Sequence, residues 1–203
     1  MIYIFYTKLN LRYQNKENKV FSSDLEKKSG KKLLQFGLKK LGLLPDYDII
    51  TNEFGKPYFK NNHIYFNISH SEGIIICCMS YNEVGVDIQR YRTVNKNSID
   101  LYWNLKDYIN FDQNSHYSFI DVWSQKEAIA KLLGYGLSLP FKEIYIHKLR
   151  DKNFIADVNK RIVFLKKIQI DGNYSTWVAS EKGINEIRKE KYTYDAAIYS
   201  IVS

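Results

Sequence analysis

Short apolar runs separated by turn-forming residues predict that much of this chain forms strands. Sequences such as Gly55-Lys56-Pro57 and Ser71-Glu72-Gly73 are typical turns between such runs. The predicted strands cover residues 1–9, 58–59, 64–68, 74–79, 84–88, 144–147, 154–158, 162–170, 175–179 and 196–201.

The clearest helical pattern covers residues 117–133. At 100° per residue, one arc holds the apolar side chains Phe119, Val122, Ile129, Ala130 and Leu133. Gly134 follows as a typical helix stop signal. A shorter helix is predicted around residues 99–109.

Another helix is predicted over residues 23–41. Ser23 and Glu26 have the spacing of a capping box, which favours a helix start at this point. Gly30 and Gly37 disfavour this helix, because glycine in a helix interior has a high entropic cost.

The order strand, helix, strands therefore occurs twice, with a joint near Arg90. This order predicts an α+β fold of two pseudo-symmetric lobes, residues 1–90 and 91–203, each a small antiparallel sheet with a packed helix.

The composition limits the class of protein. Hydrophobic residues make up 45% of the chain, which is enough for a folded core and excludes general disorder. The adjacent cysteines Cys77 and Cys78 cannot form a relaxed disulfide with each other, which favours a reducing compartment. The start of the chain is typical of a first strand, not a signal peptide, and no apolar run is long enough to cross a bilayer. We expect a cytoplasmic protein without a membrane partner.

The net charge of +8 favours partners that carry negative charge, or simply solubility. Polyanions of this kind include nucleic acid, phosphorylated cofactors and acidic proteins. No recognised nucleic-acid motif accompanies the charge, so a nucleic-acid partner is not expected.

Three polar stretches carry candidate chemistry, and each alone has an ordinary structural explanation. Asn67-Ile-Ser69-His70-Ser71 ends an apolar strand and offers groups that hold phosphate or ribose oxygens, or else forms a turn. In Val84-Gly-Val-Asp87-Ile-Gln89, strand alternation places Gly85, Asp87 and Gln89 on one face, which suits a hard-cation site or a surface strand. Trp123, Glu127 and Lys131 form one stripe beside the apolar arc, at a cleft or as a solvated ion pair.

In this order, the three stretches resemble the signature set of the Sfp-like 4′-phosphopantetheinyl transferases. The third continues as Trp123-x-x-Lys126-Glu127-Ala-x-x-Lys131-x-x-Gly134. Gly55-Lys56-Pro57 is similar to a further family element, and the resemblance covers about residues 50–145.

The resemblance implies a magnesium-dependent enzyme that binds coenzyme A between two lobes. It would transfer phosphopantetheine to a serine of an apo-acyl or peptidyl carrier protein and release 3′,5′-ADP. The carrier is expected to be acidic and to contact the second lobe between Arg90 and Trp123. Two lobes in one chain also suggest a monomer.

The resemblance also assigns site residues. The metal ligands are Asp87 and Glu127, with Gln89 where many relatives have an acidic residue. Glu127 is the proposed general base, with a metal-bound water as the alternative, and Lys131 would stabilise charge on the pyrophosphate. The residues expected to hold the cofactor are Lys31, Lys56, Pro57, Ser69, His70, Lys126 and Lys131.

Gln89 departs from the family pattern and motivates two hypotheses. An amide oxygen ligates a cation without charge, so weaker magnesium binding or a shift toward manganese is expected. The alternative function is a catalytically weakened coenzyme A-binding or polyanion-binding protein of the same fold. A coenzyme A-binding protein with other chemistry, such as acyl transfer, would require a nucleophile or a catalytic histidine with a partner, and the four histidines lack such spacing.

Overall fold

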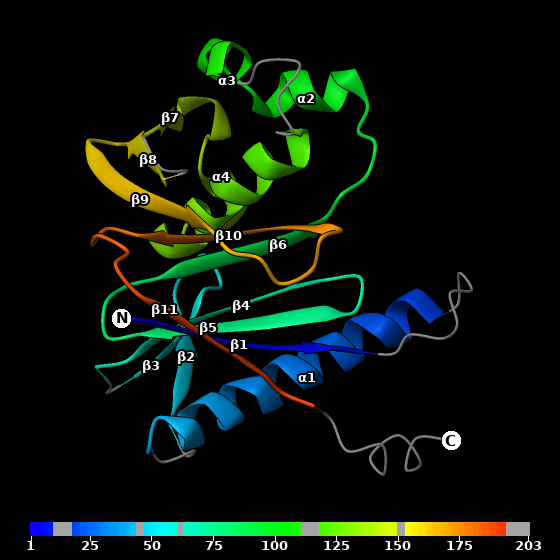
Figure 1. The fold of residues 1–203 in the computed structure, drawn as a ribbon, viewed down its shortest axis with the longest axis vertical. Coiled ribbons are helices and arrows are strands. Elements are labelled where there is room, and N and C mark those ends of the chain that lie inside the picture. The colour runs from blue at the N-terminus through cyan, green and yellow to red at the C-terminus, as the bar shows by residue number, and fades with distance from the viewer. Residues whose placement is uncertain (10–17, 44–46, 61–62, 111–117, 150–152, 194–203) are drawn as a thin grey trace.

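The computed structural model describes residues 1–9, 18–43, 47–60, 63–110, 118–149 and 153–193. It confirms the α+β class: two sheets lie between helices, and the molecule is elongated along the direction in which the lobes are stacked (Figure 1).

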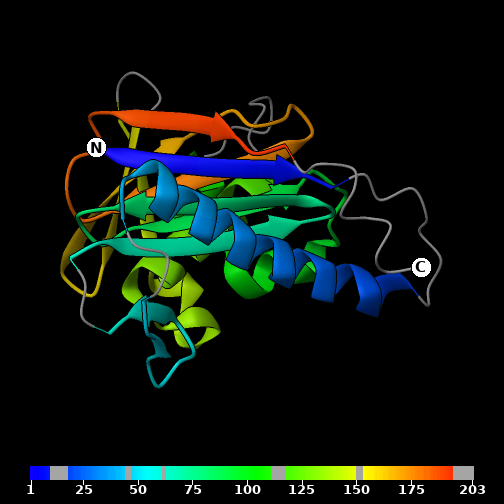
Figure 2. The same ribbon diagram turned by 90° about the horizontal axis from the view of Figure 1, so that it is seen from below.

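The first sheet has the strand order β11-β1-β5-β4. Its strands are β1 (Ile2–Lys8), β4 (Tyr65–Ser71), β5 (Ile74–Ser80) and β11 (Ile187–Lys191). Helix α1 (Asn18–Lys40) lies across the outer face of this sheet, as Figure 2 shows from below. A two-stranded hairpin of β2 (Ile49–Thr51) and β3 (Pro57–Phe59) follows α1.

The second sheet is antiparallel, with the order β6-β10-β9-β8-β7. Its strands are β6 (Gly85–Arg90), β7 (Tyr145–Lys148), β8 (Asn153–Val158), β9 (Arg161–Lys167) and β10 (Tyr174–Ser180). Helix α4 (Phe119–Leu133) covers its outer face through contacts with β6 and β10. The short helices are α2 (Lys96–Tyr102), α3 (Leu105–Asn110), η1 (Gly136–Ser138) and η2 (Phe141–Glu143).

The apolar core is divided into layers by the two sheets. One cluster packs between α1 and the first sheet, a second between α4 and the second sheet, and a third between the sheets. Cys77 belongs to the α1 layer and Cys78 to the layer between the sheets, because neighbouring strand residues point to opposite faces. Both cysteines are free and buried, and burial raises the pKa of both thiols, so they remain unreactive.

The edges of the two sheets meet where β4 lies beside β6. Three polar side chains of β4 accept hydrogen bonds from backbone N–H groups of β6: Asn67 from Val86 (2.9 Å), Ser69 from Ile88 (3.3 Å) and Ser71 from Arg90 (3.1 Å). These contacts satisfy every second N–H group on an edge that would otherwise be unpaired. They fix β6 relative to the first lobe.

The sheets do not follow the predicted boundary at residue 90. Strand β6 pairs with β10 of the second sheet, and β11, from the end of the chain, pairs with β1 of the first. The β1–β11 pair is parallel, whereas only antiparallel pairing was expected. The strand β11, like β2, has no clear apolar alternation and was not predicted from the sequence.

Several predicted element bounds also differ from the structure. Helix α1 already includes residue 18, so the expected helix start at Ser23 is wrong. The helix continues through Gly30 and Gly37 because both face the sheet closely: a Cβ on Gly37 would lie 2.6 Å from Met79 Sδ. The predicted helix 99–109 is two helices, α2 and α3. The predicted strand 196–201 lies outside the described residues.

Over the residues that the structure covers, we find no helix with both the length and the apolar character needed to cross a bilayer.

Candidate functional site

Strand β6 directs Asp87 toward α4, as the strand alternation predicts. Val84, Val86 and Ile88 are fully buried in the layer between the sheets. Asp87 lies on the opposite face and is also fully buried. A buried carboxylate is stable only if a cation or hydrogen-bond donors compensate its charge.

Asp87 has a compensating cation on one of its oxygens. Its Oδ1 atom accepts hydrogen bonds from Lys131 Nζ (2.6 Å) and from Ser69 Oγ (2.8 Å). Lys131 Nζ also donates to Ser69 Oγ (2.8 Å), so three side chains from β4, β6 and α4 meet. The second oxygen, Oδ2, is buried and accepts no hydrogen bond from an N–H group or a hydroxyl within the described part of the chain. The site therefore holds an acceptor that is free to bind a further cation.

Glu127 lies next to this group on α4, and its amide neighbour is Gln89, whose Nε2 donates to Glu127 Oε2 (3.2 Å). Burial raises the pKa of Glu127 to about 7, and the charge of Asp87 and a hydrogen bond between the two carboxyls act in the same direction. Lys131 and Gln89 act in the opposite direction. The carboxyl groups of Asp87 and Glu127 thus face each other, although forty residues separate them in the sequence.

Gly85 permits this meeting because it lets the backbone of α4 approach β6. A Cβ at Gly85 would lie 2.5 Å from the Leu132 amide nitrogen and 2.9 Å from Leu132 Cβ, and even closer to the Ala128 carbonyl oxygen. No side chain fits at these distances. The glycine that precedes Asp87 by two residues is therefore required by the packing of the helix that carries Glu127.

The predicted cofactor residue Lys126 points away from this group. Its ammonium is 1% exposed and donates to Asp107 Oδ2 (2.5 Å) and to the carbonyl oxygens of Tyr102 (3.0 Å) and Phe141 (2.8 Å). An ammonium has three N–H donors, and all three are used here. This geometry does not support a cofactor contact for Lys126.

Lys56 and Pro57 lie on the β2–β3 hairpin, which Figure 2 shows beside α4. Lys56 Nζ donates to the Leu132 carbonyl oxygen (2.7 Å), and Asn52 Nδ2 donates to the Gly134 carbonyl oxygen (2.9 Å). The hairpin thereby satisfies free carbonyl groups at the C-terminus of α4. Burial lowers the pKa of Lys56, and the charge of Glu83 partly opposes the effect.

The other predicted cofactor residues differ in accessibility. His70 is half-exposed, and its Nδ1 pairs with Glu26 Oε2 (3.0 Å). Lys31 is exposed on α1. Ser69 is buried, and its hydroxyl is already bonded to Asp87, Lys131 and the Ile88 N–H group. His70 and Lys31 are free to meet a ligand, whereas Ser69 acts on the neighbouring side chains.

Sequence reasoning missed the role of Glu26 and that of Asn67. Glu26 is buried and also accepts the Gly73 N–H group (2.8 Å), so it fixes the β4–β5 turn that follows His70. No local pattern in the sequence marks this position as buried, because the burial of Glu26 depends on the β4–β5 turn that packs against α1. For Asn67, the signal was its alternation with Ser69 and Ser71, which places three polar side chains on one strand face.

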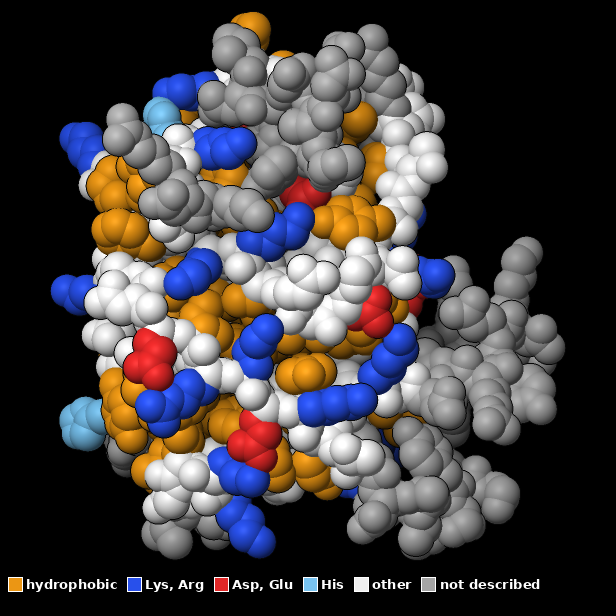
Figure 3. Space-filling model, viewed as in Figure 1, with side chains coloured by type: hydrophobic (Ala, Val, Ile, Leu, Met, Phe, Trp, Pro, Cys, Tyr) orange, Lys and Arg blue, Asp and Glu red, His pale blue; other side chains and the backbone are white. Residues whose placement is uncertain are grey.

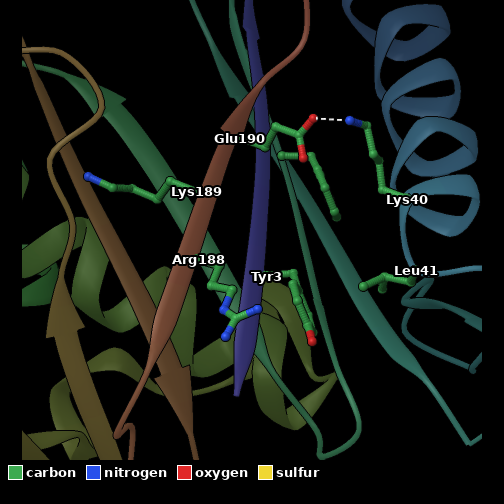
Figure 4. Close-up of a pocket in the computed structure, with 7 residues that line it drawn as sticks. Tyr3, Lys40, Leu41, Arg188, Lys189 and Glu190 are labelled. Carbon is green, nitrogen blue, oxygen red and sulfur yellow. Dashed lines mark ion pairs between the residues drawn. The ribbon is translucent and has the colours of Figure 1, made fainter.

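A cavity of about 460 Å³ lies apart from this group, between the end of α1 and strands β1 and β11 (Figure 4). It is lined by Tyr3, Phe5, Lys40, Leu41, Arg188, Lys189 and Glu190. Lys40 and Glu190 form an ion pair (2.5 Å) that ties α1 to β11. Lys189 points away and donates to the Gln169 carbonyl oxygen (3.0 Å). We interpret this cavity as part of the attachment of β11, not as the reaction site.

The donor set suits a hard cation with few protein ligands. Among the described residues, no group of three or more His, Cys, Asp or Glu side chains could hold a metal. Two carboxylates and one amide are present instead: Asp87, Glu127 and Gln89. Magnesium is commonly held by one or two carboxylates together with substrate phosphates. The raised pKa of Glu127 shows that ionising it beside Asp87 is unfavourable, and a cation bound to both carboxylates would remove that cost.

Comparison with known proteins shows which family the chain resembles. A family model described as the 4′-phosphopantetheinyl transferase superfamily matches residues 83–181, which include β6, α4 and β10. The chain is 33% identical over 124 residues to the 4′-phosphopantetheinyl transferase gsp of Aneurinibacillus migulanus, a match that covers 58% of this chain and 52% of that protein. It is 26% identical over 143 residues to the 4′-phosphopantetheinyl transferase Sfp of Bacillus subtilis (strain 168), covering 66% and 63%. The chain thus spans little more than half of the length of these relatives. These matches show that the chain is similar to the 4′-phosphopantetheinyl transferase superfamily over residues 83–181, and that its curated relatives include Sfp and gsp.

Proposed function

We propose that this chain is a 4′-phosphopantetheinyl transferase that moves the phosphopantetheine arm of coenzyme A to a serine of an apo-acyl or peptidyl carrier protein. The observation that carries the proposal is the carboxyl pair of Asp87, which is fully buried, and Glu127, which is partly buried; the two meet beside Lys131. The names of the relatives support the same activity. The serine oxygen bonds to the β-phosphorus of coenzyme A, the bond from that phosphorus to the bridging oxygen breaks, and 3′,5′-ADP leaves.

Asp87, Glu127 and Gln89 are the proposed ligands of magnesium, with manganese as an alternative metal. When bound, the metal would neutralise negative charge on the pyrophosphate. Two of these ligands, Asp87 and Gln89, are positioned by β6. The side chains of Asn67, Ser69 and Ser71 hold that strand in place.

Glu127 is the proposed acceptor of the serine proton. Burial raises its pKa to about 7 in the metal-free protein, and a bound cation would lower that pKa and keep the carboxylate ionised, as a proton acceptor must be; a metal-bound water is the alternative base. Lys131 would stabilise charge on the departing 3′,5′-ADP; the support is its partly buried ammonium, which pairs with Asp87 and whose charge also acts on Glu127. Lys131 Nζ uses two of its three N–H donors on Asp87 and Ser69, so the third would be available to a phosphate oxygen.

The proposed contacts with coenzyme A are Lys31, His70, Lys56 and Pro57. His70 has its Nδ1 atom held by Glu26, which leaves Nε2 for a phosphate oxygen. Lys56 has two N–H donors beyond the one that it uses on Leu132. Ser69 acts indirectly, by holding Asp87 and Lys131.

For the carrier protein we propose the outer side of α2 and α3. Leu101 is 66% exposed, Leu105 is 80% exposed, and Tyr108 lies beside them. Lys106 and Lys142 add positive charge nearby, which complements an acidic carrier. We further propose a cytoplasmic monomer, a proposal that the free thiols of Cys77 and Cys78 support for the compartment.

The surplus of basic residues gives limited support to the alternative polyanion-binding function. On the face shown in Figure 3, Lys and Arg are scattered among apolar and acidic side chains. Several of them are paired within the protein: Lys8 with Asp171, Lys40 with Glu190 and Arg188 with Glu186. Unlike a nucleic-acid groove, this face is not a continuous stripe of one sign.

The test is mass spectrometry of a panel of apo-carrier proteins after incubation with coenzyme A, magnesium and this protein. A gain of one phosphopantetheine mass is expected for at least one carrier. Asp87→Ala and Glu127→Ala should abolish the gain while circular dichroism stays unchanged, and the exposed-carboxylate variant Asp157→Ala serves as the matched control. Wild-type turnover by both site variants would refute the mechanism. Salt-sensitive binding of single-stranded nucleic acid without coenzyme A binding would favour the alternative.

A further inference from the structure

Lys126 joins three segments of the second lobe through one buried ammonium. Its partners are Asp107 in α3, the carbonyl oxygen of Tyr102 at the end of α2, and the carbonyl oxygen of Phe141 at the start of η2. Lys126 is 1% exposed and Asp107 is fully buried. A pair of this kind has a high desolvation cost, and losing one member leaves an uncompensated charge.

The same contacts fix the start of α3. The Asn104 N–H group donates to Asp107 Oδ2 (2.9 Å), and the Asp107 N–H group donates to Asn104 Oδ1 (3.0 Å). Asn104 Nδ2 donates to the carbonyl oxygens of Lys142 and Ile144, both at 3.0 Å. The joint between α2 and α3 is therefore held mainly by polar contacts that converge on Lys126 and Asp107.

Aliphatic side chains contribute little to holding these two helices, and their apolar contacts are mainly aromatic. Leu101 and Leu105 are largely exposed, and Tyr108 is exposed while its hydroxyl donates to Asp100 Oδ1 (2.5 Å). The apolar contact to α4 comes from Tyr102, whose ring lies 4.6 Å from that of Trp123, and from Trp103, whose ring stacks on that of Phe119 at 6.2 Å. Helices of seven and six residues are not stable alone in water, so their place depends on such tertiary contacts.

We propose that Lys126 is a positioning residue that holds α2 and α3 as the docking surface for the carrier protein. The inference rests on the proposed function, because it assigns a role in the second substrate's binding. Lys126 precedes Glu127 in α4, so the two side chains point in different directions from one rigid helix. One helix thereby fixes the docking surface relative to the carboxylate that meets the carrier serine.

The experiment compares Lys126→Met with the wild type in steady-state transfer and in hydrogen exchange. We expect the KM for the carrier to rise about tenfold or more, which corresponds to about 1.4 kcal/mol. The KM for coenzyme A and kcat should change by less than about twofold, because the Asp87 side of α4 is not altered. Amide exchange should accelerate in α2 and α3 but not in β6. Lys182→Met, an exposed lysine of the same lobe, is the matched control.

A second variant separates the ion pair from general damage. Lys126→Met combined with Asp107→Asn removes both buried charges, while the amide oxygen at position 107 still accepts the Asn104 N–H group. This double variant should regain most of the carrier affinity. Three results would overturn the positioning role of Lys126. One is an unchanged carrier KM in folded Lys126→Met, and another is an equal loss in kcat and in coenzyme A binding. The third is a double variant that does not fold or does not recover carrier affinity. If the wild type modifies no carrier, the proposed function fails, while the exchange experiment still tests the positioning of α2 and α3.

Discussion

Replacing Gly85 by alanine tests how closely α4 must approach β6. The added Cβ would lie 2.5 Å from the Leu132 amide nitrogen, whereas non-bonded carbon contacts are favourable near about 3.5–4 Å. The obstacle is helix backbone, since the carbonyl oxygen of Ala128 is nearer still. A side-chain rotation cannot relieve this contact. We therefore expect α4 to move away from β6 by about 1 Å.

The displacement should affect both stability and transfer. Overpacking in a core typically costs about 1–3 kcal/mol, and for a chain of this size each 1 kcal/mol lowers Tm by about 2–4 °C. Because Glu127 immediately precedes Ala128, the shift also separates Glu127 from Asp87. A misplacement of about 1 Å in a reaction site can reduce the rate about 100-fold. We expect both losses in Gly85→Ala.

The assay combines thermal unfolding, measured by circular dichroism, with the carrier-modification rate. Gly172→Ala is the matched control, because a Cβ at Gly172 meets no heavy atom within 4 Å. The control should retain the wild-type Tm and rate. A Gly85→Ala protein with unchanged Tm and rate would show that β6 and α4 are not in the close contact described, and would refute the reasoning.

Three further predictions concern charges at and near the site. Gln89→Glu adds a third carboxylate beside Glu127, so calorimetry should detect tighter magnesium binding, and an unchanged titration would rule out a role for position 89. The pKa of Glu127 in the folded, metal-free protein is about 7, above its ordinary 4.5. In chelator the folded state therefore keeps this proton to higher pH than the unfolded state does, and the free energy of unfolding should fall as the pH rises from about 4.5 to 7. Urea unfolding across pH should lose this slope in Glu127→Gln, and persistence of the slope would contradict the assignment. Glu26→Ala leaves the Gly73 N–H group without its acceptor and should cost about 1–3 kcal/mol in urea unfolding at neutral pH, whereas an unchanged midpoint would exclude that contact as a stabilising one. Burial raises the pKa of Glu26, but hydrogen bonds from His70 and Gly73 outweigh it and lower the pKa below 4.5, so the difference between variant and wild type should shrink only as the pH falls below that value.

Helices and strands with strong periodicity were predictable, and those defined by long-range partners were not. The pattern around Val122 and Ile129 predicted α4 to within two residues. Strand β11, with the sequence Ile-Arg-Lys-Glu-Lys, has no apolar face that would predict it. It becomes a strand because the exposed edge of β1 offers it a row of hydrogen-bond partners.

The candidate site divides in the same way. Strand alternation placed Gly85, Asp87 and Gln89 on one face, and helical spacing placed Glu127 and Lys131 on one stripe. Lys126 is the informative failure. The family resemblance placed it among the cofactor residues, but its ammonium binds a buried acceptor from another helix, Asp107.

The sequence by itself determined the periodicities, the α+β class and the residue types that chemistry at this site requires. These properties depend on neighbours within one strand or helix, where the backbone geometry alone sets which side chains share a face. Only the tertiary structure decided that β6 pairs with β10, that β11 returns to the first sheet, and which carboxylate each lysine meets. Each of these pairings joins residues that lie far apart in the chain. Which pairing forms depends on burial and close packing, and no local sequence pattern contains that information.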